Sequence, residues 1–170
     1  MDSLKNGRGV YKFHDGSVYE GLFRNDLPEG LGKMIYSNGD VYEGSFLHGF
    51  REGKGRYTYG NGDYYDGNWM RDLKHGNGTY KLAHDNSIYS GDWHEGHMHG
   101  HGRHQYGSGD IYEGPYERGV RKGHGKFTWS SGDYYHGDFD RDLMHGRGKV
   151  YNRDGVFHRD VEFKENRLHS

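Results

Sequence analysis

The chain has 170 residues, enough for one ordinary domain, and a formal net charge of −2 from 23 basic and 25 acidic residues. Leu, Ile, Val and Phe make up only about a sixth of it, which would suit a disordered protein if the net charge were high, but the charge is low and 16 Tyr supply apolar area of another kind. The chain has 31 Gly, two Pro and no continuous Gly-X-Y repeat, so the composition excludes collagen and proline-rich linkers. It indicates that the glycines serve regular β or turn geometry.

Two absences from the sequence bear on the compartment. Without cysteine there are no disulfides, thiolate metal sites or cysteine nucleophile, which suits a reducing environment. No stretch near the N-terminus is apolar enough for a signal-peptide core, and no later run could span a bilayer. We therefore expect a soluble, cytoplasmic protein.

A tyrosine that opens a Tyr-X-Gly triplet recurs at intervals of 23, 23, 24, 23 and 23 residues. These residues are Tyr19, Tyr42, Tyr65, Tyr89, Tyr112 and Tyr135. Four positions later a second aromatic follows each of them: Phe23, Phe46, Trp69, Trp93, Tyr116 and Phe139. A Gly-X-Gly comes next, starting at Gly30, Gly53, Gly76, Gly100, Gly123 and Gly146, with an earlier copy at Gly7. A spacing this regular indicates a repeat array.

Each interval predicts one β-hairpin. Residues 42–46 alternate apolar and polar with period two, and residues 53–59 do the same, so every second side chain shares a face. Turn dipeptides separate the hairpins: Asp15-Gly16, Asn38-Gly39, Asn61-Gly62, Ser108-Gly109, Ser131-Gly132 and Asp154-Gly155. About fourteen short strands are expected.

The parity of the strands explains the glycines between the aromatic residues. Gly44 shares a face with Tyr42 and Phe46, and Gly55 shares the same face with Tyr57, so half of that face has no side chain. Aromatic rings can lie over strand glycines, which lets a sheet without a second layer bury its own apolar face. No segment has the helical period needed to cover it. The expected fold is all-β, an elongated single-layer antiparallel sheet of stacked hairpins.

This combination of Tyr-Glu-Gly-X-Phe/Trp, X-Gly-X-Gly, aromatic-X-aromatic and Asn/Asp-Gly-Asp at a 23-residue period resembles the MORN (membrane occupation and recognition nexus) repeat over residues 7 to 163. The resemblance implies a rod of stacked hairpins with an aromatic-lined groove, and roles in protein binding, assembly and attachment to cytoskeleton or membranes. It divides the chain into an N-terminal half-repeat (1–18), six repeats (19–41, 42–64, 65–88, 89–111, 112–134 and 135–155) and a degenerate C-terminal half-repeat that caps the array (156–170).

Three departures from the repeat carry structural expectations. The third repeat is one residue longer, and its turn should place Asn86 at positive φ. Pro115 should remove a hydrogen bond of the ladder or mark a bend. After Gly155 the register should slip, with Phe157 and Phe163 in the capping half-repeat.

Aromatic residues on one face of the sheet form the predicted partner-binding groove, where a peptide or helical segment of another protein could use several anchors. They are Tyr42, Phe46, Tyr57, Tyr59, Tyr65, Trp69, Tyr80, Tyr89, Trp93, Tyr106, Tyr112, Tyr116, Phe127, Trp129, Tyr135 and Phe139. The alternative is that these rings only form the core and partners bind elsewhere.

A histidine-rich segment is the one place where metal chemistry comes into question. His97, His99 and His101 would project to one face of a strand with ~7 Å between neighbours, and neutral imidazoles so placed can bind zinc, nickel or copper. However, His99 stands directly before a Gly-X-Gly, as His75 and His145 do, which indicates a position of the repeat. We therefore expect neither a metal site nor a cofactor.

No catalytic constellation stands apart from the repeat. Acidic residues such as Glu20, Glu43, Asp66 and Glu113 recur at equivalent positions and are interpreted as solvated strand residues. The Gly-X-Gly pairs lack the Gly-Lys-Ser/Thr or βαβ context of a nucleotide site. The chain is not expected to be an enzyme.

A peripheral membrane or phosphoinositide-binding module is the alternative function. Four basic residues at equivalent turn positions could form a sparse basic edge that attracts anionic lipid: Arg51, Lys74, Arg121 and Lys122. Elsewhere basic and acidic residues alternate and the sequence pI is about 6.7, so protein binding is favoured. No nucleic-acid partner is expected. Stand-alone MORN arrays of this size resemble components of cilia, flagella and other cytoskeletal assemblies, so we expect a cytoskeleton-associated protein, with the axoneme as the specific hypothesis.

An open sheet leaves an edge strand at each end, where another chain can pair. The C-terminal edge is protected by charges around Phe163: Asp160, Glu162, Lys164, Glu165 and Arg167. The N-terminal strand, residues 7–13, has no such protection. Any self-association is therefore expected through the N-terminal half-repeat.

Overall fold

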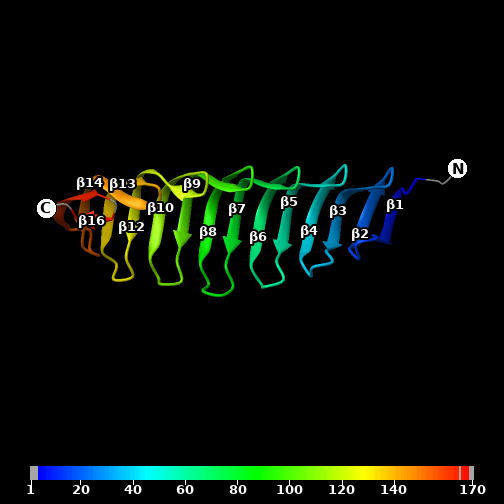
Figure 1. Cartoon of the computed structure of the whole chain (residues 1–170), viewed down its shortest axis with the longest axis horizontal. Coiled ribbons are helices and arrows are strands. Elements are labelled where there is room, and N and C mark those ends of the chain that lie inside the picture. The colour runs from blue at the N-terminus through cyan, green and yellow to red at the C-terminus, as the bar shows by residue number, and fades with distance from the viewer. Residues whose placement is uncertain (1–3, 165, 169–170) are drawn as a thin grey trace. The chain divides into compact units, whose positions relative to one another are not determined.

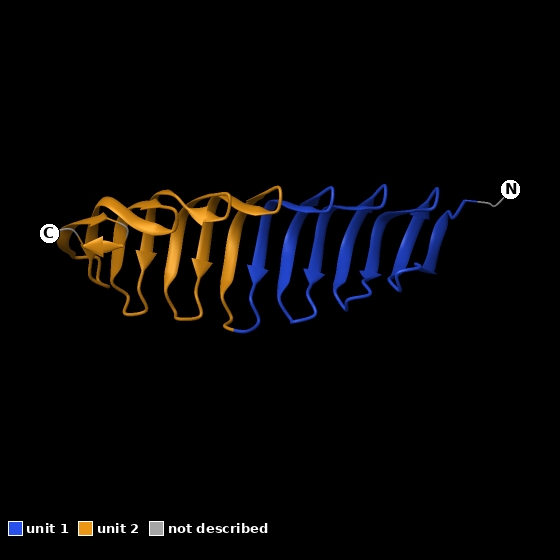
Figure 2. Ribbon diagram, in the orientation of Figure 1, with its two compact units in different colours: residues 1–84 blue, residues 85–170 orange. Residues whose placement is uncertain are grey.

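The computed structural model describes residues 4–164 and 166–168 of the chain. It divides into two compact units, residues 1–84 and 85–170 (Figure 2). The described residues form sixteen strands and no helix, and therefore no helix that could cross a membrane.

Unit 1 is a single layer of seven strands in which each strand pairs antiparallel with the next one along the chain (Figure 1). They are β1 (Gly7–Lys12), β2 (Val18–Arg24), β3 (Leu27–Ile35), β4 (Val41–Leu47), β5 (Phe50–Thr58), β6 (Tyr64–Met70) and β7 (Leu73–Lys81). The hairpins β2–β3, β4–β5 and β6–β7 correspond to the three repeats predicted in this part of the sequence.

Unit 2 has the same construction. Its strands are β8 (Ile88–His94), β9 (His97–Gln105), β10 (Ile111–Glu117), β11 (Val120–Arg121), β12 (Gly123–Thr128), β13 (Tyr134–Asp140), β14 (Leu143–Tyr151), β15 (Phe157–Lys164) and β16 (Arg167–Leu168). Strand β10 pairs with β9 on one side and with both β11 and β12 on the other. The all-β, single-layer antiparallel sheet of hairpins predicted from the sequence is confirmed.

Two strands come in addition to the fourteen expected. One is the two-residue β16, and the other arises because β11 and β12 are separated at Lys122, which faces Pro115. The Lys122 N–H donates to the Pro115 carbonyl oxygen at 3.1 Å, but proline has no N–H to return the bond, and the ladder is interrupted there. The expected effect of Pro115 is confirmed.

The hairpins close through turns of two residues with positive φ, as in a type I′ turn. In the first complete repeat these are Asn25 (49°) and Asp26 (69°). The third repeat uses Arg71 (45°) and Asp72 (69°), although neither is a glycine and this conformation is unfavourable for most side chains. The loop at the end of that repeat has Asn86 at 60°, which confirms the prediction for this residue.

The two glycines of each Gly-X-Gly have different tasks, as Gly53 and Gly55 show. Gly53 has a φ of +76° and lies where the register of β4 against β5 shifts. Gly55 has an ordinary φ, but a Cβ added to it would overlap the ring of Tyr42. The first glycine is required by the backbone, and the second by the aromatic ring above it.

The core consists of tyrosine rings that lie over these glycines. The ring of Tyr42 covers Gly44 and Gly55 on neighbouring strands, and its hydroxyl donates to the Ser45 carbonyl oxygen at 2.9 Å. Phe46 packs edge-to-face against Tyr42, with centroids 5.0 Å apart. The same arrangement recurs at Tyr19, Tyr65, Tyr89, Tyr112 and Tyr135, and all six tyrosines are at most 2% exposed. As predicted, each sheet buries one face under its own rings.

At the ends of the strands away from the tight turns, one repeat binds the backbone of the next. Asp40 Oδ1 accepts a hydrogen bond from the Gly60 N–H at 2.9 Å, and Asp63 Oδ1 accepts one from the Ala83 N–H at 2.8 Å. In unit 2 the corresponding acceptors are Ser87, Asp110 and Asp133, which bind the N–H groups of Gly107, Ser130 and Arg153 at 3.0, 2.8 and 3.1 Å. This contact accounts for the final Asp of the Asn/Asp-Gly-Asp signature.

The two end strands differ. Among the described residues β1 pairs with β2 alone, and Val10 on β1 is 68% exposed. At the C-terminal end the register of β14 against β15 shifts between Val150 and Tyr151, which confirms the predicted slip, and β16 pairs with β15 at Phe163 and Lys164. Glu165, predicted to protect this edge, lies outside the described residues.

Candidate partner-binding surface

The structure divides the aromatic residues of the predicted groove into two sets. The tyrosine of each Tyr-X-Gly and the aromatic four positions later are at most 7% exposed and form the core: Tyr42, Phe46, Tyr65, Trp69, Tyr89, Trp93, Tyr112, Tyr116, Tyr135 and Phe139. The others are half-buried: Tyr57, Tyr59, Tyr80, Tyr106, Phe127 and Trp129. Only this second set can contact a partner without opening the core.

In unit 1 the half-buried rings form a continuous row. The ring centroids of Tyr57 and Tyr59 are 4.7 Å apart, and those of Tyr59 and Tyr80 are 6.0 Å apart. Tyr36, which is not among the predicted groove residues, extends the row, since its ring centroid lies 5.6 Å from that of Tyr57. We refer to Tyr36, Tyr57, Tyr59 and Tyr80 as the tyrosine row.

Arg51 lies against these rings. Its Cζ is 5.0 Å from the ring centroid of Tyr57 and 4.6 Å from that of the buried Trp69, and its side chain is 18% exposed. Its Nε donates to Asp72 Oδ1 at 2.9 Å, and its Nη2 donates to the Asp72 carbonyl oxygen at 3.0 Å. Cation–π attraction and the ion pair together hold the guanidinium over the rings.

Lys74 occupies the equivalent position of the next repeat. Its Nζ lies 4.3 Å from the ring centroid of Tyr80 and 5.6 Å from that of Tyr59. Burial lowers the pKa of Lys74 to about 8, and the charge of Arg51 acts in the same direction. A lysine in this position offers a partner a charged group inside an aromatic environment.

Arg121 repeats the arrangement in unit 2, whereas Lys122 does not. Arg121 Cζ lies 5.7 Å from the ring centroid of Phe127, and its Nε lies 3.4 Å from Asp142 Oδ1. Lys122 is exposed and its Nζ lies 2.9 Å from Glu117 Oε2. The four basic residues suggested as a basic edge therefore have different surroundings, and Lys122 has an acidic neighbour instead of a ring.

Asp40 connects the tyrosine row to the turns. The Tyr57 hydroxyl donates to Asp40 Oδ2 at 2.6 Å, and the carboxylate, which is 9% exposed, also accepts bonds from Asn38 and Gly60. The hydrogen bond from Tyr57 is the main cause that lowers the pKa of the Asp40 carboxyl below its ordinary value. The ring of Tyr57 is thereby fixed in orientation before any partner arrives.

The aromatic face of unit 2 carries a hollow of about 690 Å³ near its C-terminal end. Its apolar lining is Phe127, Trp129, Phe139, Met144, Val150, Val161, Phe163 and Leu168, and its polar groups are Asp110, Arg121, Ser131, Asp133, His158, Arg159 and Asn166. We refer to it as the C-terminal hollow. The lining combines aromatic rings with polar and charged groups, which can contact a partner segment.

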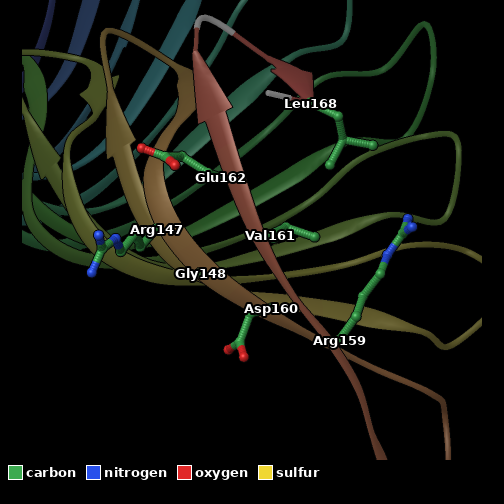
Figure 3. A pocket seen from close by; sticks show the side chains of 7 residues that line it. All are labelled: Arg147, Gly148, Arg159, Asp160, Val161, Glu162 and Leu168. Atoms are coloured by element: carbon green, nitrogen blue, oxygen red, sulfur yellow. The ribbon is translucent and has the colours of Figure 1, made fainter. Parts of the chain in front are cut away.

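A second hollow, of about 780 Å³, surrounds β15 (Figure 3). Asp160 and Glu162 extend to one side of the strand, and Arg159 and Val161 extend to the other (Figure 3). Since its lining belongs to both faces of the sheet, it is not one concave site, and we assign no binding role to it.

The histidine segment lies on β9. His97, His99 and His101 are all exposed, and the alternation between the last two is interrupted at Gly100, whose φ is +85°. His99 Nδ1 accepts a hydrogen bond from the Arg118 N–H at 3.3 Å. Within residues 4–164 and 166–168, no three His, Asp or Glu side chains are placed to hold a metal ion.

Comparison with known proteins supports the repeat and the fold. The MORN repeat profile matches residues 1–18, 19–41, 42–64, 65–83, 89–111, 112–134 and 135–157. A similar solved structure is the TCP domain of Drosophila melanogaster SAS-4 (dCPAP) in complex with a proline-rich motif of Ana2 (dSTIL), with a TM-score of 0.52 and 12% identity over 96% of this chain and 89% of that chain. The TCP10c domain of Drosophila melanogaster Sas-4 gives a TM-score of 0.43 and 14% identity over 92% and 99% of the two chains. At 12% identity, the first of these two structures supports the fold alone. No curated protein matches the sequence.

Proposed function

Because the chain belongs to the MORN repeat family, we propose that it is a non-catalytic scaffold that binds an extended segment of a partner protein on its half-buried aromatic residues. The observation that carries the proposal is the C-terminal hollow, where Phe127 and Trp129 lie with centroids 5.8 Å apart beside Arg121. Tyr, Trp and Arg are the side chains enriched at interaction hot spots, because they combine large rigid area with a polar group.

A proline-rich segment is the partner class that we propose to test first. The SAS-4 TCP domain, whose fold is similar, is in a complex with a proline-rich motif. Proline-rich segments bind aromatic-lined surfaces well because their extended helix is formed before binding and little conformational entropy is lost. The tyrosine row and the C-terminal hollow both supply such rings.

The contacts of the basic residues favour protein over lipid as the ligand. Attraction to an anionic membrane needs clustered Lys and Arg near the surface, whereas Arg51 and Arg121 contact Asp72 and Asp142, and Lys122 contacts Glu117. Binding to acidic vesicles is the competing outcome.

We also propose, on the family resemblance, that the partner belongs to a cytoskeletal assembly in the cytoplasm, with a ciliary or flagellar axoneme as the specific case. Imaging of the tagged chain in a ciliated cell tests this location separately from the binding surface. A diffuse distribution, or one at a membrane, would count against it.

The binding test uses proline-rich peptides selected from a displayed library and measured by fluorescence anisotropy. We expect Trp129→Ala and Phe127→Ala to weaken binding by about 5- to 30-fold, the usual cost of 1–2 kcal/mol for an aromatic anchor. Thr128→Glu is the matched control, since Thr128 lies between them and faces the other side of the sheet. Melting temperatures establish that all three variants fold. If Thr128→Glu abolished binding while the folded aromatic variants did not, the surface would be misassigned.

A further inference from the structure

Unit 1 carries exposed apolar side chains beside the tight turns of successive hairpins. They are Leu4 (56% exposed), Leu27 (45%), Leu47 (43%), Phe50 (48%), Met70 (39%) and Leu73 (46%). Leu4, Leu27, Phe50 and Leu73 follow one another at intervals of 23 residues. We refer to these six residues as the tip strip.

The five residues of the tip strip that lie on strands, all except Leu4, are on the face of the sheet opposite the tyrosine row. Leu47 is paired directly with Phe50, so their side chains share a face. Their neighbours Phe46 and Arg51 are also paired with each other and contact the aromatic side. Because side chains alternate along a strand, the tip strip points away from the proposed partner surface.

The fold does not require these residues to be apolar. In unit 2 the corresponding positions beside the turns include His94, His97, Glu117 and Asp140, and the hairpins close in the same way. Leaving large apolar groups in water is unfavourable, and unit 2 avoids it at most of these positions. The tip strip of unit 1 therefore calls for an explanation other than folding.

Its size is that of an interaction surface. At the exposures given above, six such side chains leave on the order of 500 Å² of apolar area in water, at the upper end of the patches found on monomeric proteins. In protein interfaces slightly more than half of the buried area is apolar. An interface built around this apolar area would therefore bury about 800 Å² on each partner, which is the standard size for a stable complex.

The spacing of the apolar residues and the charges around them favour a second copy of the chain as the partner of the strip. Equivalent residues of successive hairpins are two strands apart, about 9.6 Å, and a second copy of the chain presents apolar groups at the same interval. The rim carries both signs of charge, since Arg24 is paired directly with Leu27 and Glu29 follows two residues after Leu27 on the same strand, so both share a face with Leu27. A mixed rim suits a self-complementary contact better than an anionic membrane, which attracts an excess of basic residues.

We propose that the tip strip is the contact surface of a homodimer, in which the strips of two copies pack against each other. The aromatic faces of both copies then point outward, and the dimer presents two equivalent surfaces for partner segments. Two linked sites raise the apparent affinity for a partner that contains two binding segments.

Sedimentation velocity over about 1 to 200 µM tests the proposal with the full chain. The main variant is Leu47→Glu with Phe50→His and Leu73→His, because unit 2 folds with Glu117 and His97 at equivalent positions. We expect the wild type to form a dimer and this variant to dissociate at least tenfold more readily. The control is His97→Gln with Glu117→Gln, which changes the same positions of unit 2 and should leave the dimer unchanged. Circular dichroism and melting temperature confirm the fold of each.

Three results would overturn the proposal. A wild type that stays monomeric over the whole range excludes it, and so does a folded strip variant that dimerises as the wild type does. The third is a dimer lost on Val10→Lys but kept by the strip variant, which would assign association to the open edge of β1, because a charge there blocks edge pairing. Capture of the wild type by phosphatidylserine vesicles, without a dimer in solution, would identify the strip as a membrane contact.

Discussion

A single missing Cβ decides the packing of each repeat, and Gly55 is the position that tests it. Gly55→Ala should lower the free energy of unfolding by about 2–3 kcal/mol, because the methyl group would overlap the Tyr42 ring and overpacked cores cost this much. Gly60→Ala is the control, since its nearest neighbour would be 3.7 Å away and its φ is not positive. Urea denaturation measures both variants. Equal stabilities would show that the ring can move aside.

Lys74 should give stability an unusual dependence on pH. Its folded pKa of about 8 lies below the ordinary value of 10.5, so above pH 8 the unfolded chain binds more protons and stability rises with pH. The rise continues to about pH 10, where tyrosines of the unfolded chain begin to ionise and oppose it. Urea denaturation between pH 7 and 10 should show this rise in the wild type and a flatter profile in Lys74→Met. Parallel profiles for the two proteins would contradict the assigned environment.

At the scale of the hairpin, the two-residue turns differ in how well their sequence suits their backbone. Arg71 has a φ of 45°, whereas Asn25 supplies a better residue at the same position of the first repeat. Arg71→Asn should therefore raise the free energy of unfolding by about 0.5–1 kcal/mol, and Asn25→Arg should lower it by a similar amount. Thermal denaturation followed by circular dichroism measures both changes. Opposite signs would mean that side-chain contacts outweigh the backbone preference.

At the scale of the whole chain, the repeat should be removable as a unit. Deleting residues 42–64 joins Val41 to Tyr65. Tyr65 then takes the position that Tyr42 has in the wild type, directly after Val41. The shortened chain should fold with a lower melting temperature, since each repeat contributes its own stability and its contacts with neighbours. Deleting residues 45–66 is the control, because it leaves one extra residue inside a strand, which shifts the alternation and turns Trp69 to the other face. Dispersed amide resonances are expected for the first deletion and not for the second.

Much of the fold could be predicted because the repeat constrains each position several times. The parity of Tyr42, Gly44 and Gly55 predicted rings over glycines, and turn chemistry predicted the φ of Asn86. The turn at Arg71 could not be foreseen, since an arginine there carries no turn signal and the hairpin imposes the conformation.

Less of the candidate site than of the fold could be predicted from the sequence. Parity puts Tyr42 and Tyr57 on one face, but it does not predict that Tyr42 is fully buried and Tyr57 only half-buried, because this depends on which rings lie above the neighbouring strands. Arg51 and Lys74 recur five residues after a buried aromatic, at Phe46 and Trp69, and this spacing was the signal that could have placed them over the rings. Long side chains can extend in several directions, so the spacing alone does not fix their contacts.

The three tryptophans of the chain are divided between the core and the candidate site. Trp69 is 5% exposed, with its indole N–H bonded to the Gly55 carbonyl oxygen, and Trp93 is 7% exposed, whereas Trp129 lines the C-terminal hollow. Emission from the first two reports the integrity of the sheet, and emission from the third reports the polarity of the hollow. Occupancy of the surface and unfolding of the protein can therefore be followed as separate optical signals, without any added label.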